Sequence, residues 1–221
     1  KSLGMTVIIT DHHELQEEIP PADVVVNPHQ KNCPYPYKNL CGAGVAWKLV
    51  SALWEQLGVP EQELYEDLLL FAGFATVGDV MDLTGENRIL VKEALKLLKT
   101  TTHPGISALI EVNEISRETI SAFHIGFVLG PCINASGRLD TAKRALELLK
   151  TTDYEKALVK AAELKALNDE RKSMTDDGVQ QALDQIENSD MKGDRVLVIY
   201  LPDCHESLAG IIAGRIRERY Y

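Results

Sequence analysis

Two short runs of β-branched residues near the start of the chain predict a pair of neighbouring strands. Residues 7–10 (VIIT) and 24–27 (VVVN) are almost wholly apolar, as is typical of strands buried in a parallel sheet. Pro20 and Pro21 lie between the two runs and exclude a helix there. Residues 27–40 contain further prolines and predict a surface loop.

Beyond residue 41 the apolar positions recur at helical spacing. A helix with one apolar face is predicted over residues 42–57, and residues 61–75 are apolar around most of a helical circumference, which indicates a buried helix. Shorter helices are predicted over residues 87–98, 106–112, 116–125 and 139–149. Residues 126–137 contain glycines and are mostly apolar.

A long helix is predicted from Asp153, its expected cap, to about residue 186. Its charged surface and single apolar stripe are typical of a helix that connects two domains. Gly178 costs this helix about 1 kcal/mol relative to alanine without ending it. Residues 195–201 then predict a strand and residues 207–220 a helix, as at the opening of a second α/β domain.

The composition is that of a globular protein, with 45% hydrophobic residues and a formal net charge of −10. The apolar runs in the sequence are too short to cross a membrane. The four cysteines lack metal-binding spacing and fit a reducing, cytoplasmic setting. The negative charge argues mildly against a nucleic-acid partner, but acidic residues also hold cations, so it leaves the partner open. The first residues show no signal peptide and no initiator methionine, so we expect a fragment.

Asp11, His12 and His13 directly follow the first predicted strand. Open α/β sheets bind ligands beyond the carboxyl ends of their strands, so these side chains are aimed at a site. A neutral imidazole is a common metal ligand, and a neighbouring carboxylate fixes which ring nitrogen is free. Adjacent side chains on an extended backbone point in different directions, so one histidine is expected to hold a metal and the other to meet the substrate. The alternative is a polar turn.

Asp79 breaks the predicted buried helix. A buried carboxylate needs a partner, for which a metal is suitable; the alternative is that Asp79 caps the next turn. The small residues of the predicted loop at 130–138 allow backbone to approach a ligand closely. Arg138, at the expected entry of the next helix, suits a phosphate. The alternative there is a tight turn with an arginine in solvent.

The other histidines are expected to be structural. The pair His205-Glu206 follows the last predicted strand and precedes a predicted helix, which it is expected to cap; the alternatives are a metal ligand or a general base. Three further histidines lie in a proline-containing loop, a turn and a helix end: His29, His103 and His124.

The ordered set of motifs resembles the DHH phosphoesterases, and among them the RecJ branch. Residues 7–13 (VIITDHH) are similar to the motif that names the family. The stretches that resemble RecJ follow in order at residues 27–28, 35–36, 41–46, 76–83, 86–88 and 130–139. Residues 205–211 resemble the start of a DHHA1 domain. The resemblance covers nearly the whole chain.

The resemblance implies an α/β fold: the C-terminal part of a parallel-sheet DHH domain, a helical region, a long connecting helix and the start of a DHHA1 α/β domain. The implied divisions are residues 1–150, 151–190 and 191–221. The implied activity is metal-dependent hydrolysis of phosphodiester bonds in single-stranded DNA from the 5′ end, in DNA repair and recombination. Single-stranded DNA is the implied partner, and a single-strand-binding protein or a helicase is a candidate protein partner.

Residue by residue, the resemblance implies that His12 and Asp79 are metal ligands. It implies that His13 contacts the scissile phosphate and that Asp11 supports the histidines. Two residues are implied to bind DNA phosphate: Asn134 and Arg138. The implied cofactor is a pair of Mn²⁺ or Mg²⁺ ions, which oxygen and nitrogen ligands suit.

The chain departs from the family pattern, because the Asp-x-Asp cluster and the single aspartate that precede the DHH strand are absent, as is the late glycine-rich motif of DHHA1. Those carboxylates supply most metal ligands, so we expect that the chain alone does not assemble both metals and is inactive. Two other functions stay open: a DHH phosphatase acting on short oligonucleotides or small phosphate esters, and a metal-free DNA-binding scaffold.

Overall fold

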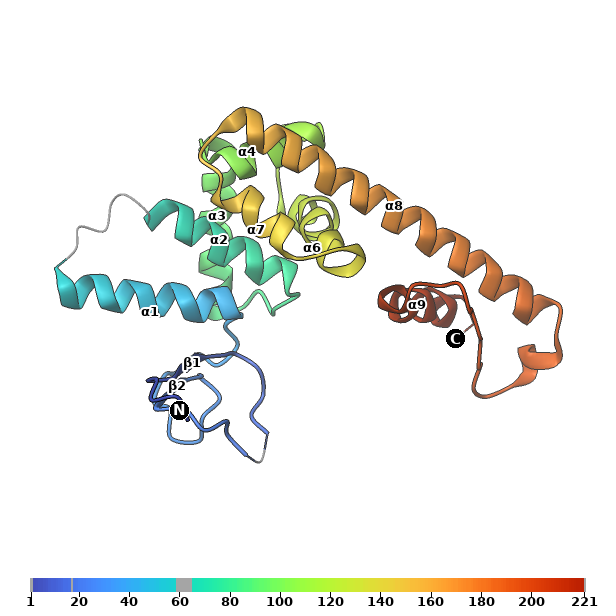
Figure 1. Ribbon diagram of the computed structural model, residues 1–221, viewed down its shortest axis with the longest axis horizontal. Helices are drawn as coiled ribbons and strands as arrows, with labels where there is room; N and C mark the ends of the chain where they lie inside the picture. The colour runs from blue at the N-terminus through green and yellow to red at the C-terminus, as the bar shows by residue number, and fades with distance from the viewer. Residues whose placement is uncertain (1, 17, 59–64, 221) are drawn as a thin grey trace. The chain divides into compact units, whose positions relative to one another are not determined.

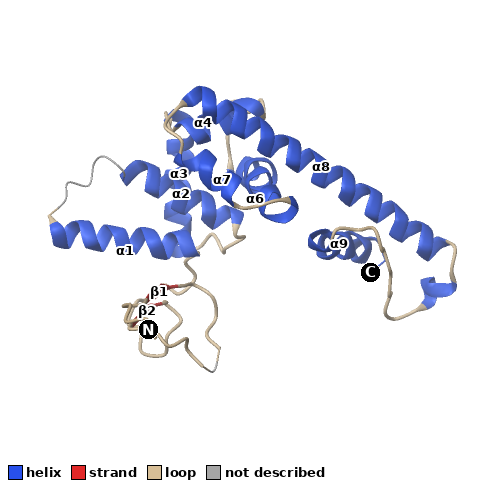
Figure 2. Ribbon diagram, in the orientation of Figure 1, coloured by secondary structure: helices blue, strands red, loops and turns tan. Residues whose placement is uncertain are grey.

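The computed structural model describes residues 2–16, 18–58 and 65–220 of the chain. These residues are mostly helical, with one small sheet near the N-terminus (Figure 2). They divide into two compact units, residues 1–130 and residues 131–221. Among the described residues, no helix has the length and apolar character needed to span a membrane.

The two predicted strands are present and pair in parallel. Strand β1 (Ile8–Thr10) lies beside β2 (Val24–Val26), with Ile8 opposite Val24. The expectation that these strands are buried is wrong, since the side chains of Ile8 and Val24 are 61% and 48% exposed. The reason is that the sheet has only these two strands in the described part of the chain, and a two-stranded sheet leaves much of its apolar surface uncovered.

Helix α1 (Gly42–Leu57) follows the proline-containing loop, as predicted. The sulfur of Cys41 caps it by accepting from the Gly44 N–H at 3.4 Å, and Gly58 ends it in the left-handed conformation at φ 63°. The remaining long helices of the first unit are α2 (Tyr65–Gly78) and α3 (Gly85–Thr100). Residues 61–64, which were predicted to begin α2, lie outside the described residues.

The close approach of α2 to α3 depends on Gly73. A Cβ at this position would lie 2.3 Å from the Cβ of Ala94 and 2.6 Å from the carbonyl oxygen of Leu90. The two backbones therefore pack at a distance that only glycine permits. This packing holds the C-terminal end of α2, where Asp79 follows, against the body of the unit.

The end of the first unit differs from the prediction. Helix α4 (Pro104–Val112) forms as expected, but residues 116–119 form a turn and the next helix begins only at α5 (Ala122–His124). The loop predicted at 130–138 is instead part of the helix α6 (Gly130–Leu139), and the π-helix η1 (Ile125–Leu129) precedes it. Ile125, Leu129 and Cys132 are fully buried at helical spacing, and this burial outweighs the weak helix propensity of the glycines.

The second unit is built on the long helix α8 (Tyr154–Glu187), drawn in orange in Figure 1. Asp153 caps it by accepting from the Lys156 N–H at 3.1 Å, as predicted. The shorter helices of the unit are α6, α7 (Lys143–Lys150), η2 (Asp190–Gly193), η3 (Glu206–Leu208) and α9 (Ala209–Tyr220). Gly178 brings α9 close to α8, since a Cβ there would lie 2.5 Å from Cδ1 of Ile212.

The strand predicted over residues 195–201 is absent. The segment keeps the alternation of a strand, with Leu197 and Ile199 packed on the core between α8 and α9 while Val196 and Val198 are 72% and 78% exposed. A strand also needs a hydrogen-bonded neighbour, and the described residues pair none with it; Figure 2 draws the segment as loop. The predicted start of a DHHA1 domain therefore stays a prediction.

Candidate metal centre

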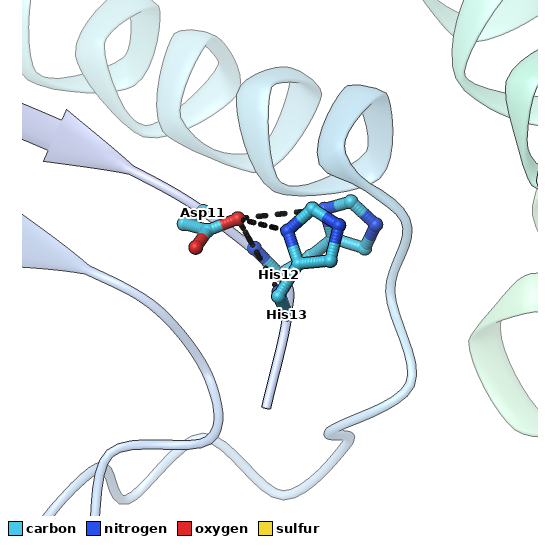
Figure 3. Close-up of side chains that lie close together, drawn as sticks. All are labelled: Asp11, His12 and His13. Carbon is cyan, nitrogen blue, oxygen red and sulfur yellow. Dashed lines mark hydrogen bonds and ion pairs between the residues drawn. The ribbon is translucent and has the colours of Figure 1, made fainter. Parts of the chain in front are cut away.

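The DHH segment leaves the sheet at Asp11. The Asp11 N–H still bonds the Val26 carbonyl at 3.0 Å, which extends the ladder by one residue. Its carboxylate oxygen Oδ1 then accepts from the N–H groups of His12 and His13 at 2.8 and 3.3 Å and lies 2.7 Å from Nδ1 of His13 (Figure 3). The bonds from the His13 ring and the two backbone N–H groups lower the pKa of Asp11 to about 2. The carboxylate is therefore ionised at neutral pH.

His12 meets Asp79 across the first unit, as the motif comparison predicted. Nε2 of His12 lies 3.0 Å from Oδ2 of Asp79, although the residues are 67 positions apart. Asp79 follows the last turn of α2, and Val80 reverses the chain with a φ of 57°. The alternative was that Asp79 caps the next turn; its carboxylate instead contacts His12, and the next helix, α3, has Thr84 as its N-cap.

The two histidines differ in exposure. The side chain of His12 is 18% exposed and that of His13 is 76% exposed. Their ring centroids lie only 4.3 Å apart, because the strand ends at Thr10 and the backbone bends at His13. The expectation that they point in different directions is therefore wrong: they are neighbours, one enclosed and one open to solvent.

Two contacts fix the position of this segment. A Cβ at Gly42, the first residue of α1, would lie 3.2 Å from Nδ1 of His12, so the helix start borders the ring closely. The buried Asn27 donates from Nδ2 to the carbonyl of His13 at 3.0 Å and accepts from the His29 N–H at 2.8 Å. Asn27 thus ties the turn to the end of β2.

The residues present fit a divalent cation. Asp11, His12 and His13 each offer a ligand atom, and these atoms lie within 4.8 Å of one another. The 3.0 Å between His12 Nε2 and Asp79 Oδ2 suits two ligands of one ion, because bonds of about 2.1 Å at a right angle place the donors about 3 Å apart. Nitrogen and oxygen donors without a thiolate suit Mn²⁺ and Mg²⁺.

The predicted phosphate-binding residues lie in the second unit. Asn134 and Arg138 are both exposed on α6. The prediction that Arg138 stands at the entry of a helix is wrong: it occupies the last turn of α6, where a cation is favoured by the negative end of the helix dipole. Its guanidinium donates to the Ser207 carbonyl at 3.0 Å, and the Ser207 hydroxyl donates to the Arg138 carbonyl at 3.2 Å.

Arg171 lies near both Arg138 and Arg215, and the sequence analysis missed Arg171 and Arg215. Burial lowers the pKa of Arg171 on α8, and the positive charges of Arg138 and Arg215 lower it further. Arg171 is held by Asn168, which accepts from its Nε at 3.1 Å and donates to the sulfur of Cys132 at 3.6 Å. Three arginines are therefore grouped in the second unit, and Asp176 forms an ion pair with one of them, Arg215. The members of this arginine cluster (Arg138, Arg171 and Arg215) are far apart in the sequence, so motif analysis does not detect it.

The histidines expected to be structural include three helix caps. His103 accepts from the Ile106 N–H at 3.3 Å and His205 from the Ser207 N–H at 3.3 Å. His124 accepts from the Ser121 N–H at 3.1 Å in a capping box. These rings are engaged by backbone N–H groups, which confirms the prediction for these three.

Comparison with known proteins agrees with the motifs. Residues 1–74 match the DHH family, N-terminal domain. Over 100% of its length the chain is 36% identical to the single-stranded-DNA-specific exonuclease RecJ of Salmonella typhimurium. The chain is a RecJ homologue of the DHH family. It is also 36% identical over its full length to RecJ of Bacillus subtilis.

Solved RecJ structures share the fold. The crystal structure of RecJ from Thermus thermophilus in complex with Mn²⁺ matches 99% of this chain with a TM-score of 0.84 and 32% identity, and the match covers 32% of that chain. A RecJ bound to manganese matches 98% of this chain and 53% of its own, with a TM-score of 0.85 and 35% identity. The chain spans 40% of the Salmonella RecJ and 27% of the Bacillus RecJ.

Proposed function

We propose that this chain provides part of an exonuclease that hydrolyses phosphodiester bonds in single-stranded DNA from the 5′ end, with Mn²⁺ or Mg²⁺ as cofactor. The observation that carries the proposal is the meeting of His12 Nε2 and Asp79 Oδ2 at 3.0 Å beyond a parallel strand. The similarity of the whole chain to RecJ supports it.

In this proposal His12 and Asp79 hold the cation. A bound divalent ion supplies a water of lowered pKa and polarises a phosphoryl oxygen. The exposed His13 contacts the scissile phosphate, and Asp11 orients it, because the 2.7 Å bond to Nδ1 leaves Nε2 as the ring nitrogen open to substrate.

The DNA-binding role falls to the second unit. Arg138 and Asn134 bind a backbone phosphate of the strand, for which the fork of a guanidinium is suited. The arginine cluster supports this role, because in a chain of net charge −10 it provides a local site for a polyanion.

The proposal also covers the organisation of the chain and its cellular context. It includes the division at residues 1–150, 151–190 and 191–221, a cytoplasmic location, a role in DNA repair and recombination, and a single-strand-binding protein or a helicase as protein partner.

Metal binding tests the proposal directly. Calorimetric titration with Mn²⁺ is expected to show binding to the chain that is lost in His12→Ala and Asp79→Ala. Asp82→Ala, which removes an exposed carboxylate three residues away, is the matched control and is expected to bind as the wild type does. A wild-type chain that binds no Mn²⁺, or variants that bind it equally well, would contradict the assignment.

A nuclease assay with Mn²⁺ completes the test. The chain alone is expected to be inactive, since the carboxylate motifs that supply most ligands are absent from its sequence. Robust digestion of a long single strand that is abolished by His13→Ala would show that the site is complete after all. Turnover of a dinucleotide without turnover of the long strand would identify a small-substrate phosphatase.

A further inference from the structure

Two phenylalanines form an exposed stacked pair on the first unit. Phe123 on α5 and Phe127 on η1 are 61% and 70% exposed. Their ring centroids lie 5.0 Å apart with an interplanar angle of 27°, so the rings stack. Phenylalanine has no polar group to offer water, and a large aromatic surface left in solvent marks a binding surface.

The backbone beneath the pair is firmly anchored. The Gly130 N–H bonds the Ile125 carbonyl, which closes the wide π turn. Ile125 and Leu129 are fully buried on the inner side of this turn. A π turn inside a helix is frequently found at functional sites. The pair is therefore presented to solvent by a packed element, which lowers the entropic cost of binding.

The element that carries the pair packs against helix α2, which leads to Asp79 of the candidate metal centre. Gly126 lies between the two rings in sequence, and a Cβ there would lie 3.6 Å from Cγ1 of Val77. Val77 belongs to the last turn of α2 and precedes Asp79 by two residues. The aromatic pair and the metal-binding carboxylate thus belong to adjacent turns of one packed unit.

The stretch of sequence that carries the pair contains no acidic residue. The chain contains 33 Asp and Glu residues, yet none occurs between Glu118 and Asp140. A phosphate backbone therefore meets no carboxylate from this stretch of sequence. The flat faces of unpaired bases stack on aromatic side chains without regard to sequence, and they match the parallel ring faces better than an aliphatic partner does.

We propose that Phe123 and Phe127 form a stacking platform for an unpaired nucleobase of single-stranded DNA. The inference rests on the proposed function, because it takes its ligand from the strand that the metal centre would cleave. The pair acts in binding: it holds a base while the phosphate backbone is engaged elsewhere.

Binding of a labelled oligothymidylate to the chain, in EDTA so that no cleavage occurs, tests the platform. Phe127→Leu and Phe123→Leu keep an apolar side chain but remove the ring. Each is expected to weaken binding about five- to a hundredfold, the range typical of aromatic substitutions at such platforms. The matched control is Ile89→Ala, which removes another exposed apolar side chain of the same unit and is expected to leave affinity unchanged.

An abasic strand of equal length separates stacking from other effects. It keeps the phosphates but has no bases, so wild type and Phe127→Leu are expected to bind it equally. Equal losses on both strands would assign the effect to misfolding or phosphate contact and overturn the inference. If the wild type binds single-stranded DNA and Phe127→Leu binds it equally well, the stacking-platform inference is overturned but the proposed function is not. If the wild type has no affinity for single-stranded DNA, the proposed function is overturned as well. A wild-type dimer dissociated by Phe127→Leu would instead assign the pair to self-association.

Discussion

The carboxylate of Asp11 organises the DHH turn through a single oxygen atom. Oδ1 is bonded by the backbone N–H groups of His12 and His13 and by the His13 ring. These bonds keep the turn closed and the His13 ring oriented. The stability of the turn therefore depends on the ionisation of one side chain.

This dependence predicts a pH effect on the metal-free chain. The pKa of Asp11 is about 2 in the folded state, below the ordinary 3.8. Because the folded-state pKa is the lower one, the stabilisation is fully present above the unfolded value and is lost as the pH falls from 3.8 towards 2. Over that window the urea midpoint of the wild type is expected to fall more steeply than that of Asp11→Ala. If the urea midpoints of the wild type and Asp11→Ala fell equally with pH, Asp11 would contribute nothing to the stability of the folded chain.

For single residues, the order of motifs along the chain was more informative about the candidate site than the chemistry of each residue and its sequence neighbours. The strand-end position of Asp11, His12 and His13 indicated a site, but only the resemblance to a family connected them with Asp79, 67 residues from His12. Spacing along the chain does not encode such a contact, since it forms through the packing of α2. Arg171 carries no motif signal at all, because its neighbours come from two other helices.

At the scale of elements, helical periodicity predicted most of the structure. Helices α1, α4 and α8 form where the apolar spacing placed them. The predictions of secondary structure failed where the local sequence favoured one conformation and the burial or pairing of side chains in the fold favoured another. Small residues suggested a loop at 130–138, yet buried apolar residues form a helix there. The apolar run at 195–201 suggested a strand, but it lacks a neighbouring strand within the described residues.

Helix packing predicts opposite effects for two helical glycines. At Gly73 a Cβ would lie 2.6 Å from the Leu90 carbonyl oxygen, so Gly73→Ala must push α2 away from α3 and is expected to destabilise by about 1–3 kcal/mol or more. At Gly214 in α9 a Cβ would meet nothing within 4 Å, so Gly214→Ala is expected to stabilise by about 0.5–1 kcal/mol. Urea denaturation of both variants measures the difference; changes of equal sign would contradict the packing argument.

At the scale of the whole molecule, the distribution of charge is more informative about DNA binding than the net charge. The total of −10 gave no indication of the arginine cluster, because its members come from α6, α8 and α9 and meet only in the folded second unit. Sequence analysis predicted positive charge near Arg138 from the proposed DNA path, and it could not say which side chains supply it.

The cluster predicts a salt effect on DNA binding. Each cation that contacts a phosphate of a single strand adds about 0.7 to the slope of log affinity against log salt. Arg171→Gln is therefore expected to weaken binding of oligothymidylate and to reduce that slope by about 0.7. Arg88→Gln on α3, outside the cluster, is the control. An unchanged slope in Arg171→Gln would remove this arginine from the DNA path.

The long sequence separation between His12 and Asp79 makes cation affinity a property of the native topology. An unfolded chain has these two side chains on segments that rarely meet, so it offers the ion no comparable chelate. If His12 and Asp79 bind the cation as proposed, thermodynamic linkage requires that ion binding shifts the folding equilibrium towards the native state, by an amount that grows with the logarithm of the free ion concentration. A bound ion would therefore act as a cross-link that stabilises the packing of the end of α2 against the end of β1.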